Sequence, residues 1–466
     1  MVNILNLSRL TLAIGATLAT TTAFSAGLDR SGQNTTAFFQ DGLYAEAVYT
    51  YIDGSVSGYD NAVVSDKETN IEGNKVDSII ETYDFFRFGV KDDINDKWSV
   101  GVLYDEPWGA AVKYSGDNNF VATDANTSMQ KLTKKTTEKF GYPDGLTIDQ
   151  AKKLIASGTL DPATSKKLAN AIGVAKVSAS KQGEATNVEV RTNSLTGIVG
   201  YKFGENNNFQ VYGGPVLQRT HGDISLRGIA YGGSTGYDAH ISPDTDLGWL
   251  AGVAYYKPEI ALKAALTYRS EIDHAASIDE IVPVGDIQVA AGNLKYKDDN
   301  SKIDITTPES IDVDFQTGLN KTTLLTANVR YVPWSDFTIT PPKYNALTKL
   351  QTKDDKGLPI ASYSDDQWKV DLGLAKRLND KLAVSGGIGW DSGAGNPTSS
   401  LGPVEGYYSA GLGAKYNITD NWAVSAGGKY LWFGDAEAEL PSKELVGNFE
   451  DNDGFVAAIK LSYQEK

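Results

Sequence analysis

The sequence contains no cysteine and only three histidines. Without cysteine there are no disulfide bridges and no thiolate metal sites. With so few histidines, a metal centre built on imidazole ligands is not expected either. We therefore predict no resident metal ion, no cofactor and no catalytic residues, and the chain is not expected to be an enzyme.

Positive charge is also scarce, since 43 lysines and arginines face 59 acidic residues and leave a net charge of −16. This balance argues against nucleic acid as a partner, because phosphate binding needs a basic surface. Beyond the N-terminus there are no apolar runs long enough for a membrane-spanning helix. A transmembrane β-barrel remains open, because it crosses the bilayer with short strands that have a single apolar face.

The N-terminus has the features of an export signal. Arg9 precedes a segment of apolar and small residues, Leu10–Ala23, and the run Ala23-Phe24-Ser25 puts small residues at both critical positions of a signal-peptidase site. We predict that residues 1–25 are a signal peptide and that the mature chain begins at Ala26. Export would place the protein outside the cytosol.

Alternating residues dominate the rest of the chain, beginning with a hairpin over residues 80–114. Phe86, Phe88 and Val90 alternate with Arg87 and Gly89, so one face of the strand is apolar and the other is not. Including the two arms of this hairpin, the pattern predicts about fourteen strands. The others are Leu43–Ile52, Arg191–Phe203, Phe209–Thr220, Leu247–Tyr256, Ala261–Glu271, Ile311–Thr317, Thr323–Thr340, Gln367–Arg377, Lys381–Asp391, Tyr407–Tyr416, Trp422–Phe433 and Phe455–Tyr463.

Short turns alternate with long polar connections along this series. An all-β transmembrane antiparallel barrel with both ends at its short-turn side has this asymmetry, whereas a soluble sandwich does not. The segment 53–78 is expected to be a polar connection. The long loop 115–187 should be partly helical and extracellular, with helices capped by Thr147 and by Asp161 ahead of Pro162.

The third strand is unusual because Pro107 lies deep inside it. Proline has no backbone N–H, so it should interrupt the pairing of an otherwise long strand. We expect such a deep break in this strand alone. Taken by itself, the break also fits a bulge that tunes the shape of the barrel.

The charged faces of the predicted strands should line the lumen, because a charge at the bilayer midplane costs about 2–4 kcal/mol. The lumenal cations are candidates either to hold a carboxylate headgroup or to form ion-pair networks with Asp312, Asp371 or Glu271. These cations are Arg87, Lys263, Arg269, Arg330 and Lys369.

Several short motifs, in order along this pattern, resemble the FadL/TodX outer-membrane transporters of long-chain fatty acids and hydrocarbons. They are Ala26-Gly27-Leu28, Tyr104–Gly109, Leu226–Gly232, Tyr255–Ile260 with Leu266–Ile272, and Thr307–Ser310 with Asp314–Gly318. The resemblance extends over nearly all of the mature chain.

The resemblance implies a fourteen-stranded barrel at residues 43–466, an N-terminal plug at residues 26–42 and a path for hydrophobic ligands. It also implies that Pro107, Trp108 and Gly109 form a lateral opening in the wall. Sideways release into the bilayer keeps an acyl chain out of water, at about 0.8 kcal/mol per methylene.

In this interpretation the protein is a monomer in outer-membrane lipid and lipopolysaccharide, and its partner is a long-chain fatty acid or another hydrophobic small molecule. The segment ahead of the first strand is shorter than in better-known members and lacks their Asn-Pro-Ala motif. Phe38 and Phe39 in that segment are candidates either to contact the ligand or to pack the plug against the wall.

Two other functions fit part of this sequence. A general diffusion porin for small polar solutes would share the barrel but needs an open, charged lumen. A lipase is suggested by Gly232-Gly-Ser-Thr-Gly236, but a nucleophile elbow requires a turn from strand to helix, and the pattern predicts no helix there.

Overall fold

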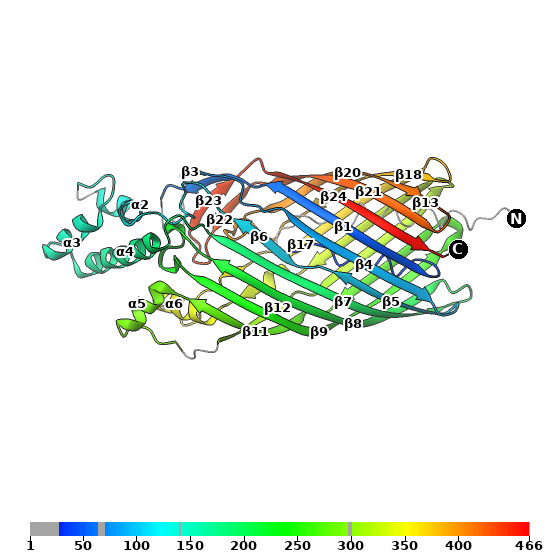
Figure 1. The fold of residues 1–466 in the computed structure, drawn as a ribbon, viewed down its shortest axis with the longest axis horizontal. Coiled ribbons are helices and arrows are strands. Elements are labelled where there is room, and N and C mark those ends of the chain that lie inside the picture. Colours follow the sequence, from blue (N-terminus) through cyan, green and yellow to red (C-terminus); the bar gives the residue numbers. More distant parts are fainter. Residues whose placement is uncertain (1–27, 64–69, 139–140, 297–300, 466) are drawn as a thin grey trace.

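The computed structural model describes residues 28–63, 70–138, 141–296 and 301–465 and shows a closed antiparallel barrel of 14 strands (Figure 1). The predicted signal peptide lies outside the described residues. The wall is formed by β1 (Tyr44–Ser55), β4 (Tyr83–Asp93), β5 (Trp98–Asp105) with β6 (Gly109–Lys113), β7 (Asn187–Phe203), β8 (Phe209–Ser225), β9 (Asp238–Lys257), β10 (Leu262–Arg269) with β11 (Ile272–Ile281), β12 (Ser301–Thr307) with β13 (Ser310–Asn320), β14 (Thr323–Val332), β17 (Gln367–Arg377), β18 (Leu382–Asp391), β20 (Glu405–Asn417), β21 (Trp422–Gly434) and β24 (Asp453–Gln464).

The barrel closes because β1 pairs with β4 on one side and with the last strand, β24, on the other. Alternation places apolar side chains outward: in β24, Phe455, Ile459 and Leu461 are exposed, while Val456 and Lys460 point inward and are buried. The predicted fold class is confirmed. Among the described residues, no helix is long and apolar enough to cross a membrane.

The short turns gather at one end of the barrel, where β24 ends, and the helices lie at the other end (Figure 1). Polar side chains close these turns. Asn95 Oδ1 accepts hydrogen bonds from the backbone of Lys97 (2.9 Å) and Trp98 (3.0 Å). Asn379 Oδ1 repeats this pattern with Lys381 and Leu382, both at 2.9 Å. Such Asx turns fix the chain reversal between adjacent strands.

Three helices form most of the loop between β6 and β7: α2 (Ala125–Thr137), α3 (Ile148–Ala156) and α4 (Pro162–Ser180). Thr147 caps α3 in a capping box with Gln150, and Asp161 caps α4 ahead of Pro162, so both predicted helices are confirmed. The helix α2, capped by Asp124, was not predicted. A small apolar core joins the three helices; its buried members are Met129, Leu146, Ala151, Leu168 and Ala175.

The remaining elements also lie toward the end with long loops. They are the helices α5 (Pro283–Ala290) and α6 (Pro342–Thr352), the turns η2 (Ile229–Ser234) and η4 (Trp334–Asp336), the pair β15 (Thr338–Ile339) and β16 (Ala361–Ser362), and a small sheet of β2 (Gly58–Asn61), β3 (Glu72–Val76), β19 (Thr398–Ser399), β22 (Ala436–Glu439) and β23 (Leu445–Phe449); η3 (Pro258–Ile260) lies in a short turn.

Three sequence predictions need correction. The segment 53–78 is not a plain connection, because β2 and β3 lie within it and β2 pairs with β23 from the far end of the chain. The strand predicted over Thr323–Thr340 ends at Val332, where Pro333 cannot continue the ladder. The third strand is not alone in its deep break, since the seventh is interrupted between β10 and β11 and the eighth between β12 and β13.

Candidate functional site

Residues 28–42, which we call the N-terminal segment, are largely buried against inward-facing side chains of the wall. The aromatic pair Phe38 and Phe39 is 1% and 3% exposed, and both rings pack on Tyr212 of β8, at centroid distances of 5.7 and 5.2 Å. Of the two roles considered for this pair, the structure shows packing against the wall.

Glycines in the wall make room for this packing. A Cβ atom added to Gly101 of β5 or to Gly200 of β7 would come within 2.9 Å of the Phe38 ring. A Cβ on Gly89 of β4 would lie 3.0 Å from the Cβ of Ala37. These contacts are shorter than normal van der Waals distances, so the inner wall fits the N-terminal segment only without side chains at these positions.

A buried arginine of β14 joins the N-terminal segment to β13. The guanidinium of Arg330 contacts Asp29 at 2.7 Å and Asp312 at 2.6 Å, and it donates a hydrogen bond to Gln33 Oε1 at 3.0 Å. Arg269 donates to the carbonyl oxygen of Gln33 at 3.1 Å. Charged groups removed from water are stable only when paired in this way.

The other predicted lumenal cations are also buried and have partners. Arg87 pairs with Glu46 at 3.4 Å, and Lys369 pairs with Asp371 at 3.2 Å. Lys263 Nζ lies 5.0 Å from the centre of the Phe39 ring, which is a cation–π distance. Of the two roles expected for these cations, interaction with partners inside the protein therefore describes them better than binding of a ligand carboxylate. The third predicted acidic partner, Glu271, is exposed beyond the end of β10.

The break in the third strand is the most distinctive part of the wall. Pairing between β4 and β5 ends at Phe88↔Tyr104, so residues 83–87 of β4 are not paired with the third strand. The backbone from Pro107 to Gly109 instead bonds to the N-terminal segment. Arg30 donates to the Pro107 carbonyl at 2.8 Å, and Gly109 donates to the carbonyl of residue 28 at 2.7 Å.

Side chains from three strands meet at this break. The Tyr83 hydroxyl lies 3.5 Å from Glu106 Oε2, and Arg191 of β7 lies over the Tyr83 ring at 4.5 Å. Arg191 and Glu106 approach within 4.0 Å of each other. A Cβ on Gly109 would be 2.8 Å from the Tyr83 hydroxyl, so glycine is needed here. The polar ends of Tyr83, Glu106 and Arg191 thus occupy the break.

Behind the break, toward the long loops, the interior is apolar. Trp108 packs edge-on against Trp334 at 5.3 Å, and Trp334 packs against Phe337 at the same distance. Two small cavities touch Leu28: one of about 20 Å³ beside Trp108 and Trp334, and one of about 40 Å³ beside residues 110–112 of β6. Each has room for only one or a few water molecules, since a single water needs about 10–15 Å³ of such space.

The sequence correctly predicted the break and the buried cations, but it missed the groups that fill the break. Tyr83 and Arg191 lie far from Glu106 in sequence, and the backbone pairing of residues 28–30 with residues 107–109 has no sequence signal. These contacts depend on how the wall closes.

A family model described as outer membrane protein transport protein (OMPP1/FadL/TodX) matches residues 164–463. A search of curated proteins gives no match. Among solved structures, a FadL homologue from Pseudomonas aeruginosa is similar at 14% identity and a TM-score of 0.60, covering 95% of this chain and 96% of that one.

Two toluene transporters have a similar fold. TodX from Pseudomonas putida shares 9% identity with a TM-score of 0.54, over 97% of both chains. TbuX from Ralstonia pickettii shares 12% identity with a TM-score of 0.50, over 96% of this chain and 98% of that one. Together with the family match and the closed barrel, these likenesses show that this chain belongs to the FadL/TodX family of outer membrane transport proteins and resides in the outer membrane of a Gram-negative cell.

Proposed function

We propose that the protein takes up hydrophobic small molecules and releases them sideways into the bilayer through the break in the third strand. The observation that carries this proposal is that the backbone of residues 107–109 bonds to the N-terminal segment, which leaves residues 83–87 of β4 paired with β1 but not with the third strand, beside an apolar interior. An apolar solute gains nothing by entering the aqueous periplasm, so release into lipid is favoured by about 0.8 kcal/mol per methylene.

In this proposal residues 26–42 act as the plug, residues 43–466 as a monomeric barrel in lipid and lipopolysaccharide, and the loop 115–187 as an extracellular addition. The two cavities at Leu28 are too small for a ligand of several carbons. Binding therefore requires Leu28 and its neighbours to move. Residues 28–30 are hydrogen-bonded to residues 107–109 of the third strand, so their movement would also change the contacts at the break.

The pairing of the lumenal cations bears on the ligand class. Each of the five predicted cations already has a partner within the protein, whether a carboxylate, a carbonyl or an aromatic ring. A fatty acid carboxylate would have to displace one of these partners, whereas a neutral hydrocarbon would not. We therefore favour neutral hydrocarbons over long-chain fatty acids, and we retain both classes for the test.

The test measures uptake of radiolabelled toluene, hexadecane and oleate by cells that lack their own transporters. The variant Gly109→Val places side-chain atoms where the Tyr83 hydroxyl lies, so it should obstruct the break. Uptake of the transported compound should fall at least tenfold. The matched control is Gly197→Val on β7, where an added Cβ would meet its nearest neighbour only at 4.0 Å.

Both variants are checked for folding by the shift in gel mobility that folded barrels show without heating. Equal uptake by Gly109→Val and the control would rule out lateral release at this break. Passage of small sugars without any hydrophobic compound would instead support a diffusion porin.

A further inference from the structure

Backbone pairing in the wall is also interrupted between β9 and the seventh strand. The ladder with β10 ends at Leu250↔Arg269, and the ladder with β11 resumes only at Ile241↔Ile278. The interruption at residues 270–271 separates these two parts. Between them, the two neighbouring strands are not joined by their regular backbone pairing.

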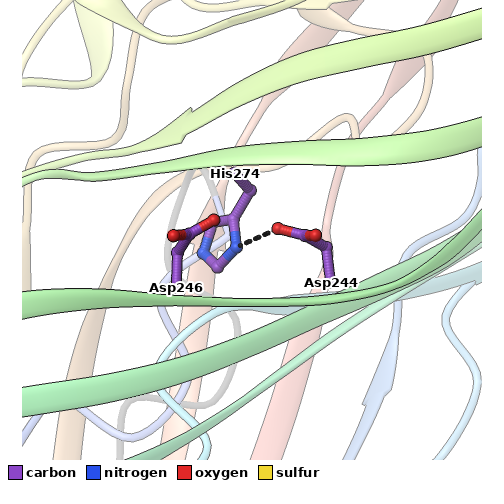
Figure 2. A group of neighbouring side chains, drawn as sticks. All are labelled: Asp244, Asp246 and His274. Atoms are coloured by element: carbon purple, nitrogen blue, oxygen red, sulfur yellow. Dashed lines mark hydrogen bonds and ion pairs between the residues drawn. The ribbon is translucent and has the colours of Figure 1, made fainter.

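Three side chains with metal-binding atoms face one another in this unpaired stretch. Asp244 and Asp246 project from β9, and His274 projects from β11 between them (Figure 2). One ligand atom from each residue lies within 4.8 Å of the other two. The His274 side chain is 0% exposed, whereas that of Asp244 is 26% exposed, so the site is sheltered on one side and accessible on the other.

The hydrogen bonds around His274 show which ring nitrogen is held by a neighbouring amide and which one faces the carboxylates. Gln218 Oε1 accepts from Thr307 Oγ1 at 2.7 Å, and Gln218 Nε2 donates to Ser194 Oγ at 3.2 Å. Oε1 therefore faces His274 Nε2, 3.2 Å away, and accepts a hydrogen bond from its N–H. Nδ1 is therefore the ring nitrogen that faces the Asp244 carboxylate, at 3.3 Å, and it is the atom through which His274 would bind a metal ion.

We infer that Asp244, Asp246 and His274 bind a divalent transition-metal ion of the Zn²⁺ type, which joins β9 to β11 where the backbone ladder lapses. One imidazole nitrogen and two carboxylate oxygens suit such an ion at about 2.0–2.2 Å, with water completing the coordination. Metal binding would require the two aspartate side chains to rotate until the three atoms reach that distance. Ca²⁺ fits less well, because it takes six to eight oxygen ligands.

The proposed site lies where an ion can reach it from aqueous solution. Trp249 and Tyr268, whose ring centres are 5.2 Å apart, lie closer to the short-turn end of these strands than the site does. Trp249 is exposed and Tyr268 is half-buried, and aromatic side chains on the outer face mark the edge of the lipid-facing belt of a barrel. The three ligands therefore lie on the extracellular side of that belt, where the two carboxylates and their ion are not held in hydrocarbon.

The experiment uses the full-length protein in detergent, dialysed against Zn²⁺ and then against metal-free buffer. Metal content is measured by mass spectrometry, affinity by calorimetry, and barrel unfolding by heat-dependent gel mobility. We expect one Zn²⁺ per chain and a higher unfolding temperature with Zn²⁺ than with EDTA. Asp246→Asn and His274→Gln should each weaken Zn²⁺ binding at least tenfold and remove the temperature shift. Asp246→Asn leaves the His274–Asp244 contact in place, so it separates metal binding from that contact.

The matched control is His240→Gln. His240 Nδ1 lies 2.7 Å from Asp223 Oδ1, and the two side chains are 55% and 60% exposed. This is an exposed histidine–aspartate pair outside the proposed metal site. Its variant should bind Zn²⁺ like the unaltered protein. The inference is overturned if the unaltered protein retains no more Zn²⁺ than His274→Gln, if His240→Gln removes binding, or if only Ca²⁺ binds.

Discussion

At the scale of single residues, Arg330 makes contacts that no neighbour in sequence could replace. Its side chain is 1% exposed and its two carboxylate partners are Asp29 in the N-terminal segment and Asp312 in β13. A buried pair of this kind adds little net stability compared with apolar residues of the same volume. Removal of the arginine alone, however, leaves the two carboxylates buried without a positive partner.

The variant Arg330→Met should therefore destabilise the folded protein by about 3–5 kcal/mol, because both carboxylates lose their partner. Unfolding in urea, followed by tryptophan fluorescence in detergent, measures this change. The triple variant Arg330→Met, Asp29→Asn, Asp312→Asn removes the stranded charges and should recover most of the loss. If the single and triple variants are equally unstable, the arginine contributes by packing and not through its charge.

At the scale of elements, the helices α2, α3 and α4 form a unit with its own small apolar core. The chain enters and leaves this unit at adjacent points. Ala122 N donates to the Glu184 carbonyl at 2.9 Å, and Gly183 N donates to the Ala122 carbonyl at 2.9 Å. A segment whose two ends are already hydrogen-bonded can be replaced by a short turn without displacing its flanking strands.

We predict that replacing residues 124–182 with two glycines leaves the barrel folded. Heat-modifiable gel mobility should be retained, and the urea midpoint should change little. Uptake of the transported compound should also stay within about twofold of the full chain, since the break in the third strand is untouched. A barrel that fails to fold without the helices would show that they are required for closure of the wall.

At the scale of the whole molecule, the lumen is divided along its length. Toward the short-turn end it contains charged groups and the N-terminal segment, and toward the long loops it contains a large apolar cluster that includes Trp108, Trp334 and Phe337. This division predicts that water and small solutes are stopped by the N-terminal segment, while the apolar part accepts hydrophobic ligands.

Removal of residues 28–41 should open the lumen to small polar solutes. In a liposome-swelling assay with arabinose, we expect the shortened protein to swell liposomes several times faster than the intact one, because the charges that faced the segment become solvated. The variant lacking the helical unit serves as the control and should stay slow. Equal swelling rates with and without residues 28–41 would show that this segment is not the plug.

The sequence by itself determined the architecture. Period-two alternation between apolar and polar residues predicted the strands and their outward faces, and the order of short and long connections predicted a barrel. Pro107 predicted the break in the third strand because proline removes a backbone donor. The caps Thr147 and Asp161 predicted two helices from local chemistry alone.

Only the tertiary structure decided how the interior is filled. Arg330 contacts Asp29 and Trp108 contacts Trp334 because the closed barrel brings distant parts of the chain together. His274 lies between Asp244 and Asp246 because of the register of two neighbouring strands. The scarcity of histidine led to the expectation of no metal site, whereas the metal site that we infer rests on one histidine faced by two carboxylates from another strand. The alternation of residues predicts which face of a strand each side chain is on. Which residue it contacts on a neighbouring strand depends on the strand register and on where backbone pairing is interrupted.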